Sequence, residues 1–319
     1  MLALTLLILV PLNHMYQKTN RYNNQNYELG KYKVVPYDIE FANFGSSHGQ
    51  LGFYYPEDGT VSFNFALSSQ TPEYDLALLK DNLKHFKEGA TIVFPISYFT
   101  PYLLSSEKDS EFESRNQRYY SILNPQLIID FEWTKMINTI FQPLNGRDTL
   151  DYGVLLNDDV LLEELDNSYG NFPLENWELD NSKNGMHLFD EAEVRWRYWK
   201  EYKANLALEQ VGTVNPEIVK IYQAIVDICN ENNLNPVFVT LPVTSELNIF
   251  ADYDFYPIFV EDMKLMMEEI GDPLYFDYSH NTNFKGNLKY FIDTDHLSKE
   301  GAIEFTQLLK KDIQNFNQY

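Results

Sequence analysis

The chain has 319 residues, of which 44% are hydrophobic and 15% aromatic, and this composition excludes a disordered, collagen-like or disulfide-stapled protein. Its 24 basic and 47 acidic side chains give a formal net charge of −23, which repels phosphate backbones, so nucleic acid is not expected as a partner. The single cysteine, Cys229, excludes an internal disulfide and a multi-cysteine zinc site.

The chain begins with an apolar segment, residues 1–12, which reads MLALTLLILVPL. A membrane-spanning helix needs about 20 apolar residues and the core of a signal peptide about 7 to 15, so the segment fits the second range. We therefore expect a hydrophobic N-terminal anchor or the remnant of a signal, followed by a polar linker over residues 13–36. This interpretation predicts an extracytoplasmic protein, membrane-anchored or secreted, in a bacterial cell envelope. The alternative is an ordinary buried strand or helix at the start of the chain.

From residue 37 onward, short apolar runs alternate with helical patterns. The predicted strands are residues 38–44, 61–67, 90–96, 236–241 and 274–276. The predicted helices are residues 72–86, 215–232, 257–270 and 298–316, with Thr71, Asn215 and Ser298 as expected N-caps. Strands that alternate with helices indicate a parallel sheet covered by helices on both faces. The sequence thus predicts an α/β protein, a three-layer α/β/α sandwich with a central parallel sheet.

Residues 101–214 interrupt this alternation. They contain a charged run and all four tryptophans, and we interpret them as a helical insertion in one α/β domain that spans residues 37–319. Trp196 and Trp199 lie three positions apart among arginines, so they could stack on a sugar ring, with a plain core contact as the alternative.

A glycine-rich turn, Gly45-Ser46-Ser47-His48-Gly49, follows the first predicted strand directly. A turn from strand to helix can hold a serine at the carboxyl edge of a parallel sheet, so Ser47 is a candidate nucleophile and a helix cap is the alternative. The spacing also matches the G-x-S-x-G elbow of α/β-hydrolases, but there several strands precede the serine, and here only one does. His48 is expected to point away from Ser47 and to bind solvent or substrate.

Asp293 and His296 precede the last predicted helix in the segment FIDTDHLS. A carboxylate three residues before a histidine can fold back and accept from Nδ1–H, which leaves Nε2 to take a proton from a serine. Adjacent side chains diverge, so Asp293 is favoured over Asp295 for this role. Asp293, Asp295 and His296 could also bind a metal, but no second ligand cluster is evident, and no metal is expected.

With these residues the sequence resembles the SGNH (GDSL-like) hydrolase superfamily of esterases and acyltransferases. The resemblance covers residues 37–102 and 215–316, and not the insertion. Gly45-Ser46-Ser47 is similar to the first block, G-D-S, with Ser46 in place of the aspartate, and residues 293–296 match the fourth block, D-x-x-H. The resemblance implies an SGNH/flavodoxin-like fold and a Ser-His-Asp triad of Ser47, His296 and Asp293 that needs no cofactor.

The two middle blocks of the family carry donors for the oxyanion. Residues 64–69 are similar to N-x-x-x-S-G, which puts Ser69 at the glycine whose backbone N–H serves the oxyanion. Residues 95–98 stand where the family has G-x-N-D, so the oxyanion asparagine is absent and Ser97 is its substitute. The resemblance implies oxyanion donors at Ser47, Ser69, Ser97 and Asn64. For Ser97 and Asn64, hydrogen bonds at strand ends are the alternative. The candidate substrate contacts are His48, Tyr98, Trp196 and Trp199.

With these departures from the family pattern, the sequence resembles an extracytoplasmic branch of the superfamily. That branch is similar to the D-alanyl-lipoteichoic acid and alginate O-acetylation proteins. There, a membrane-anchored SGNH-like domain works beside a membrane-bound O-acyltransferase on cell-surface polymers. The resemblance implies a serine acyltransferase or esterase that acts on acyl groups, chiefly acetyl, of a cell-surface glycan, with a membrane-bound O-acyltransferase as partner. The alternatives are a non-catalytic glycan-binding or assembly subunit of a polysaccharide-modification system and a simple esterase that trims acetyl groups.

Overall fold

The computed structural model describes residues 2–19, 28–56, 58–102, 112–140, 170–171, 185–200, 214–253 and 255–316. The chain divides into two compact units, Met1–Val35 with Lys108–Ser168 and Pro36–Glu107 with Tyr169–Tyr319. The first unit contains helices α1 (Leu2–Tyr16), α5 (Phe112–Tyr119) and α6 (Trp133–Ile140). The second unit contains the sheet and is called the α/β unit below.

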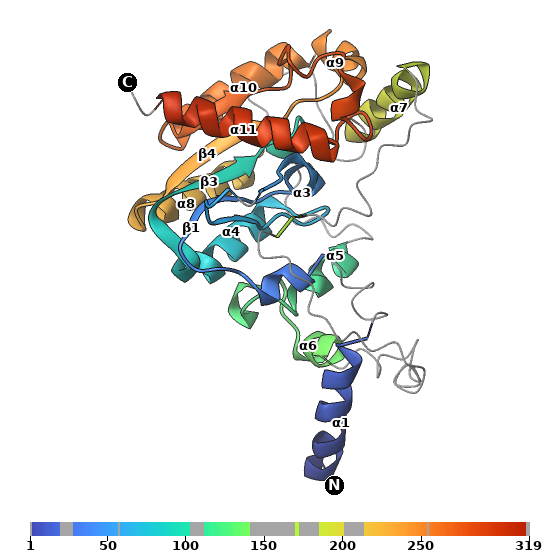
Figure 1. Ribbon diagram of the computed structural model, residues 1–319, viewed down its shortest axis with the longest axis vertical. Helices are drawn as coiled ribbons and strands as arrows, with labels where there is room; N and C mark the ends of the chain where they lie inside the picture. The colour runs from blue at the N-terminus through green and yellow to red at the C-terminus, as the bar shows by residue number, and fades with distance from the viewer. Residues whose placement is uncertain are drawn as a thin grey trace. The chain divides into compact units, whose positions relative to one another are not determined.

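The α/β unit is built on five parallel strands in the order β2-β1-β3-β4-β5 (Figure 1). The strands are β1 (Ile39–Asn43), β2 (Ser62–Asn64), β3 (Phe86–Pro95), β4 (Asn235–Thr240) and β5 (Leu274–Asp277). This is the strand order of flavodoxin-like sheets, in which the direction of winding reverses between β1 and β3. Ligands of such sheets bind in the crevice at the carboxyl ends of the strands next to this reversal. The segments that follow β1 and β3 therefore have the best placement for a site.

Helices cover both faces of the sheet, as the alternation of strands and helices predicts. On one face, Phe41, Val93 and Val239 pack with α3 (Ser47–Gly52) and α11 (Lys299–Phe316). Neighbouring strand residues point to the opposite face, where Phe94 and Phe238 pack beside α8. The other helices of this unit are α4 (Pro72–Asn82), α7 (Gly185–Tyr198), α8 (Pro216–Glu231), α9 (Ser245–Asp252) and α10 (Tyr256–Glu269). The predicted three-layer α/β/α sandwich is confirmed.

All five predicted strands form, with boundaries that differ by a few residues. The largest difference is at β3, which begins at Phe86, where the predicted helix was expected to end. Two of the three predicted caps are present, since Asn215 accepts from the Glu217 N–H and the Ser298 hydroxyl accepts from the Gly301 N–H. Thr71 makes no capping bond through its side chain.

The predicted N-terminal segment and linker differ from the structure in their boundary. Helix α1 continues past residue 12 to Tyr16, so the first residues of the expected linker are helical. Of the helices in the described residues, none combines the length and the apolar character needed to cross a membrane.

The predicted insertion, residues 101–214, is divided between the two units. Lys108–Ser168 belongs with the N-terminal segment, whereas the part from Tyr169 onward, with α7, belongs to the α/β unit. Much of the predicted insertion, Trp177 included, lies outside the described residues.

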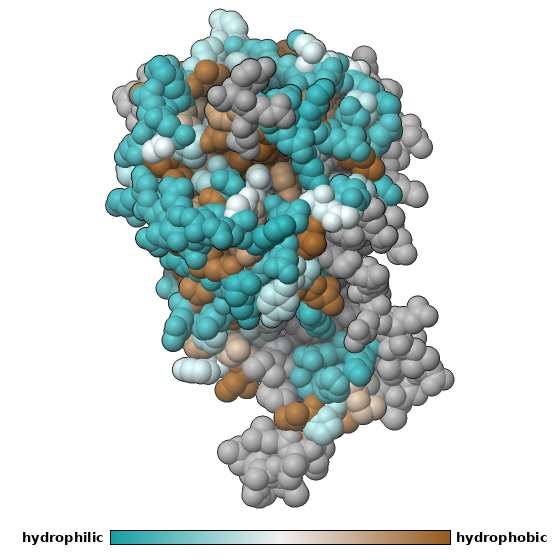
Figure 2. Space-filling view, turned by 60° about the vertical axis from the view of Figure 1, so that its left-hand side comes forward, coloured by the Kyte–Doolittle hydropathy of each residue, from teal (hydrophilic) through white to brown (hydrophobic). Residues whose placement is uncertain are grey.

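Figure 2 shows one face, on which hydrophilic side chains cover most of the described surface and hydrophobic side chains form separate patches.

Candidate active site

The candidate nucleophile lies in a tight turn between β1 and α3. Gly45 has a φ of +108°, and a Cβ at this position would lie 3.2 Å from the ring of Pro95, so the turn requires glycine on both grounds. The Gly45 N–H donates to Asp75 Oδ1 at 2.9 Å. Ser46 is the N-cap residue of α3 and Ser47 is its first residue. The turn therefore holds Ser47, half-buried, at the carboxyl edge of the sheet.

Two buried asparagines fix α3 behind this turn. Asn43 Nδ2 donates to Gly49 O at 3.0 Å and to Asn64 Oδ1 at 3.1 Å. Asn64 Nδ2 donates to the carbonyl oxygens of Gly49 and Gln50, and Asn64 Oδ1 also accepts from the Ala66 N–H at 3.0 Å. The expectation that Asn64 serves the oxyanion is wrong, because its amide nitrogen is held by backbone carbonyls. The alternative, a hydrogen-bonding role at a strand end, describes it correctly.

The three residues expected to form a triad lie together. Ser47 Oγ is 2.8 Å from His296 Nε2, and His296 Nδ1 is 2.8 Å from Asp293 Oδ2. The other oxygen of Asp293 accepts from the backbone N–H groups of Asp295 and His296 at 3.0 and 2.7 Å. The loop thus folds back as the D-x-x-H spacing predicts, and Nδ1 lies farther from Asp295 Oδ1, at 3.8 Å. All three triad side chains are partly accessible.

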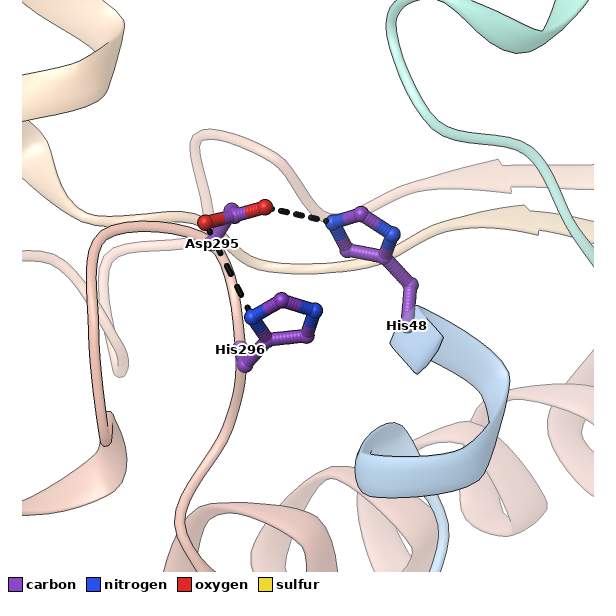
Figure 3. A group of neighbouring side chains, drawn as sticks. All are labelled: His48, Asp295 and His296. Carbon is purple, nitrogen blue, oxygen red and sulfur yellow. Dashed lines mark hydrogen bonds and ion pairs between the residues drawn. The ribbon is translucent and has the colours of Figure 1, made fainter. Parts of the chain in front are cut away.

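His48, the residue after the nucleophile, does not point away from the triad, and that expectation is wrong. Its ring stacks on the ring of His296, with centroids 4.8 Å apart and an interplanar angle of 21°. His48 Nε2 lies 3.0 Å from Asp295 Oδ2. Figure 3 marks this contact with a dashed line. The side chain is 7% exposed, so it offers little surface to solvent or substrate. The first turn of α3 directs His48 inward beside Ser47.

Arg195 reaches this group from α7. Its Nε lies 3.0 Å from Asp295 Oδ1, and a terminal nitrogen lies 3.6 Å from Asp293 Oδ2. The guanidinium therefore neutralises part of the charge of both carboxylates. The sequence analysis mentions the arginines of this segment only as neighbours of the tryptophans and misses this contact, because nothing local to α7 indicates which loop Arg195 meets.

The electrostatic surroundings give the two histidines opposite tendencies. Burial lowers the pKa of His48 more than its hydrogen bond to Asp295 raises it, so this ring tends to be neutral. Burial also lowers the pKa of His296, but the charges of Asp295 and Asp293 and the Asp293 hydrogen bond outweigh it, and the pKa is raised. Burial opposes ionisation of Asp295, yet His296, His48 and Arg195 together hold its pKa well below the usual range. His296 is therefore the ring that accepts a proton first.

His48, Asp295 and His296 are residue types that bind metals, and one ligand atom of each lies within 4.8 Å of the others. However, the Arg195 guanidinium occupies one oxygen of Asp295, and His296 Nδ1 is engaged by Asp293. Both of these contacts compete with a cation for the same ligand atoms. The arrangement suits a proton-transfer site better than a metal centre.

The remaining predicted oxyanion residues lie on loops beside the serine turn. The Leu67 N–H donates to Gly45 O at 3.2 Å, which joins the Ser69 loop to the turn. Ser69 has a φ of +54°, a conformation that glycine adopts more readily, and the sequence block that residues 64–69 resemble has glycine at this position. The backbone N–H of Ser97 donates to Thr100 Oγ1 at 3.1 Å, so that N–H is already engaged and only the half-buried hydroxyl could serve.

The three aromatic substrate contacts expected from the sequence are core residues instead. Tyr98 is 2% exposed and its hydroxyl donates to Asn248 Oδ1 at 2.9 Å. Trp196 is 7% exposed and packs edge-on against Phe255, and Trp199 is 2% exposed. Such buried rings present no face to a sugar. The alternative interpretation of the tryptophans, a core contact, is the one that the structure shows.

In comparisons with models of known protein families and with curated proteins, no match to this chain was found. The interpretation of the site therefore depends on its geometry and on the sequence patterns described above.

Proposed function

We propose that the protein is a serine acyl-transfer enzyme of the SGNH type that carries out ester hydrolysis or O-acyl transfer. The observation that supports this best is the continuous chain of contacts from Ser47 Oγ through the His296 ring to Asp293, with both distances 2.8 Å. A serine, a histidine base and an orienting carboxylate at these distances are the parts needed to activate a hydroxyl nucleophile.

In the first step, Ser47 Oγ attacks the carbonyl carbon of an ester while His296 Nε2 takes its proton. Asp293 accepts from Nδ1–H, which keeps the lone pair on Nε2, and it stabilises the imidazolium. The oxyanion needs donors, and the backbone N–H groups of Ser47 and Ser69 are our candidates. His296 then returns the proton to the leaving alcohol, and the acyl group stays on Ser47 as an ester.

In the second step, a hydroxyl group of water or of a sugar attacks the acyl-serine. His296 Nε2 takes the proton of that hydroxyl and gives it back to Ser47 Oγ as the serine ester breaks. When water is the acceptor, the product is a free acid. When a glycan is the acceptor, the product is an acylated sugar. Hydrolysis and transfer thus use the same residues, and the acceptor decides between them.

For the substrate, we propose acyl groups, chiefly acetyl, of a cell-surface glycan, with a membrane-bound O-acyltransferase as partner. The support is the resemblance to the extracytoplasmic branch and the apolar N-terminal segment. We place the α/β unit outside the cytoplasmic membrane, anchored by this segment or secreted. Protease added to intact cells that express the full chain should cleave the protein. Protection until the cells are lysed would contradict this location.

A second candidate is a non-catalytic glycan-binding or assembly subunit. The observations in its favour are the shortage of oxyanion donors, since the Asn64 amide is held by carbonyls and the Ser97 N–H by Thr100. Each missing donor costs an acyl-transfer enzyme about 100-fold or more.

One experiment separates these functions. The purified chain and its Ser47→Ala variant are assayed with an activated acetyl ester, with and without an oligosaccharide acceptor. We expect ester cleavage well above the variant, and diversion of the acetyl group to the sugar if the enzyme is a transferase. Equal rates for the two proteins would support the non-catalytic subunit.

A further inference from the structure

The proposed triad leaves Asp295, a buried acid in contact with it, without a role. The Asp295 side chain is 1% exposed and carries a negative charge among three neighbours. It accepts from the Thr294 hydroxyl at 3.2 Å, faces His48 Nε2 at 3.0 Å and faces Arg195 Nε at 3.0 Å. A buried charge is costly unless it is paired and hydrogen-bonded, and these contacts meet that need.

The contact with Asp295 also selects the tautomer of His48. Because His48 Nε2–H donates to Asp295, the lone pair of the neutral ring lies on Nδ1, which faces the Ser46 hydroxyl at 3.4 Å. His48 is therefore held at both ring nitrogens, and burial, which lowers its pKa more than Asp295 raises it, favours the neutral form. Its ring lies nearly parallel to the His296 ring (Figure 3). A neutral ring in this place does not repel the imidazolium that His296 forms.

Asp295 is close enough to His296 for its charge to affect the imidazole ring, although Nδ1 donates its hydrogen bond to Asp293. Asp295 Oδ1 lies 3.8 Å from His296 Nδ1, whereas Asp293 Oδ2 is in hydrogen-bond contact at 2.8 Å. Arg195 touches both carboxylates and therefore limits their combined negative charge. The groups that face His296 are Asp293 and Asp295 from its own loop, Ser47 and His48 from α3, and Arg195 from α7.

We propose that Asp295, held by His48 and Arg195, is a positioning residue for His296. It keeps His48 in place as a flat neutral support for the imidazole ring, and it supplies a second negative charge that stabilises the imidazolium formed when His296 takes the proton of Ser47. Arg195 has the opposite effect on that imidazolium and thereby sets how readily His296 holds the proton.

This inference rests on the proposed function, because only a base that cycles between two charge states benefits from such tuning. It gives a role to Asp295, over which the sequence analysis favours Asp293 as the residue that orients His296. The charge contributions have the required signs, since Asp295 raises the pKa of His296 against the effect of burial, and Arg195 lowers it.

The test is an NMR titration of the His296 ring in the full chain, with labelled histidine and assignment by the His296→Gln variant. Asp295→Asn removes the second negative charge, so we expect the pKa of His296 to fall. Arg195→Gln removes the positive charge, so we expect it to rise. Asp295→Asn and Arg195→Gln both break the ion pair between Asp295 and Arg195. If the pair had only a structural role, the two substitutions would not shift the pKa of His296 in opposite directions. Arg195 is partly exposed, so its variant decides the sign even if Asp295→Asn fails to fold.

Cleavage of the activated ester gives the second readout. We expect Asp295→Asn to lower kcat about tenfold or more at a pH where His296 is neutral in both proteins. His48→Ala should be impaired in the same way, and His48→Gln, whose amide nitrogen can still donate to Asp295, should recover most of that loss. Asp252→Asn is the matched control, because Asp252 pairs with His280 on the surface, 2.6 Å from Nε2, and should leave the His296 titration unchanged.

Shifts of the His296 pKa in the same direction for Asp295→Asn and Arg195→Gln, or no shift in either, would overturn the positioning role. A kcat of Asp295→Asn equal to that of the wild-type chain would also overturn the positioning role. If the wild-type chain cleaves no ester at all, the proposed function fails, and the titration still decides whether Asp295 and Arg195 tune His296.

Discussion

Ser47 and His296 are 249 positions apart in the chain, yet Ser47 Oγ lies 2.8 Å from His296 Nε2. Ser47 follows β1 and His296 lies in the loop that precedes α11. In a parallel sheet, the segments that follow the strands gather at one edge, so residues from both ends of the chain meet there. A serine and a histidine in this contact should act as a unit.

The first prediction concerns this unit. Ser47→Ala and His296→Ala should each lower kcat for an activated acetyl ester by about 10³-fold or more, because each removes one half of the same proton transfer. The double variant should be little slower than either single variant. Steady-state kinetics of the three proteins check this, and losses that multiply in the double variant would show that the residues act independently.

The second prediction concerns pH. His296 must be neutral to accept the proton of Ser47, and its pKa lies above the ordinary histidine value of about 6.5. The rate kcat/KM should therefore fall as the pH drops through a value above that ordinary one. Asp293→Asn removes a charge that raises this pKa, so its remaining activity should extend to lower pH. A pH–rate profile from acid to mildly alkaline conditions measures both, and an acid limb below the ordinary histidine value would contradict the assignment.

The third prediction tests the structural role of Asn64. Asn64→Ala removes the hydrogen bonds of a buried side chain with the Gly49, Gln50 and Phe53 carbonyls, the Ala66 N–H and Asn43. Buried groups left without partners are costly, so the free energy of unfolding should fall by roughly 2–4 kcal/mol. Urea unfolding measures it, with Asn230→Ala at an exposed position of α8 as control, expected within about 0.5 kcal/mol of wild type. An unchanged stability with a lost kcat would instead favour the rejected oxyanion role.

The fourth prediction concerns the close packing of α3. A Cβ on Gly49 would overlap the carbonyl oxygen of Phe44 and would lie 3.0 Å from the Ala66 methyl group. Gly49→Ala should therefore displace the first turn of α3, lower the free energy of unfolding by about 1–3 kcal/mol and reduce ester cleavage. Gly30→Ala, where a Cβ meets open space, is the matched control. A fully active and stable Gly49→Ala protein would show that the position of α3 does not depend on this contact.

The fifth prediction concerns metals. Because Arg195 occupies Asp295 and the proposed steps need only Ser47, His296 and Asp293, treatment with a chelator should leave ester cleavage unchanged. Ester cleavage after dialysis against the chelator, then with added zinc, measures this. Activity lost with the chelator and restored by zinc would assign the histidine and aspartate cluster to a metal.

The sequence predicted the sheet well, because its strands have local signals. β4 and β5 are apolar runs next to long amphipathic helices, and their boundaries were predicted to within a few residues. The start of β3 was missed because residues 86–89 include Lys87 and Glu88, whose exposed side chains give no apolar run. Helix α3 was not delimited, since six residues are too few for a helical period.

The triad was predictable for a similar reason, and its surroundings were not. Ser47 stands in a glycine-rich turn, and Asp293 and His296 have a local spacing that favours their contact. The partners of Asp295 come from α3 and α7, so no pattern within residues 293–296 indicates them. The buried state of Tyr98 and Trp199 likewise results from tertiary packing, which a sequence of aromatic residues does not reveal.

The central claim is that Ser47 carries the acyl group during turnover. The most direct measurement is mass spectrometry of the peptide that contains Ser47, after the full chain is mixed with an activated acetyl ester and quenched in acid. We predict one added acetyl group on Ser47, absent from Ser47→Ala and lost on a chase with water or an oligosaccharide. A wild-type chain that cleaves the ester without any acetyl group on Ser47, or that carries it on another residue, would contradict the account.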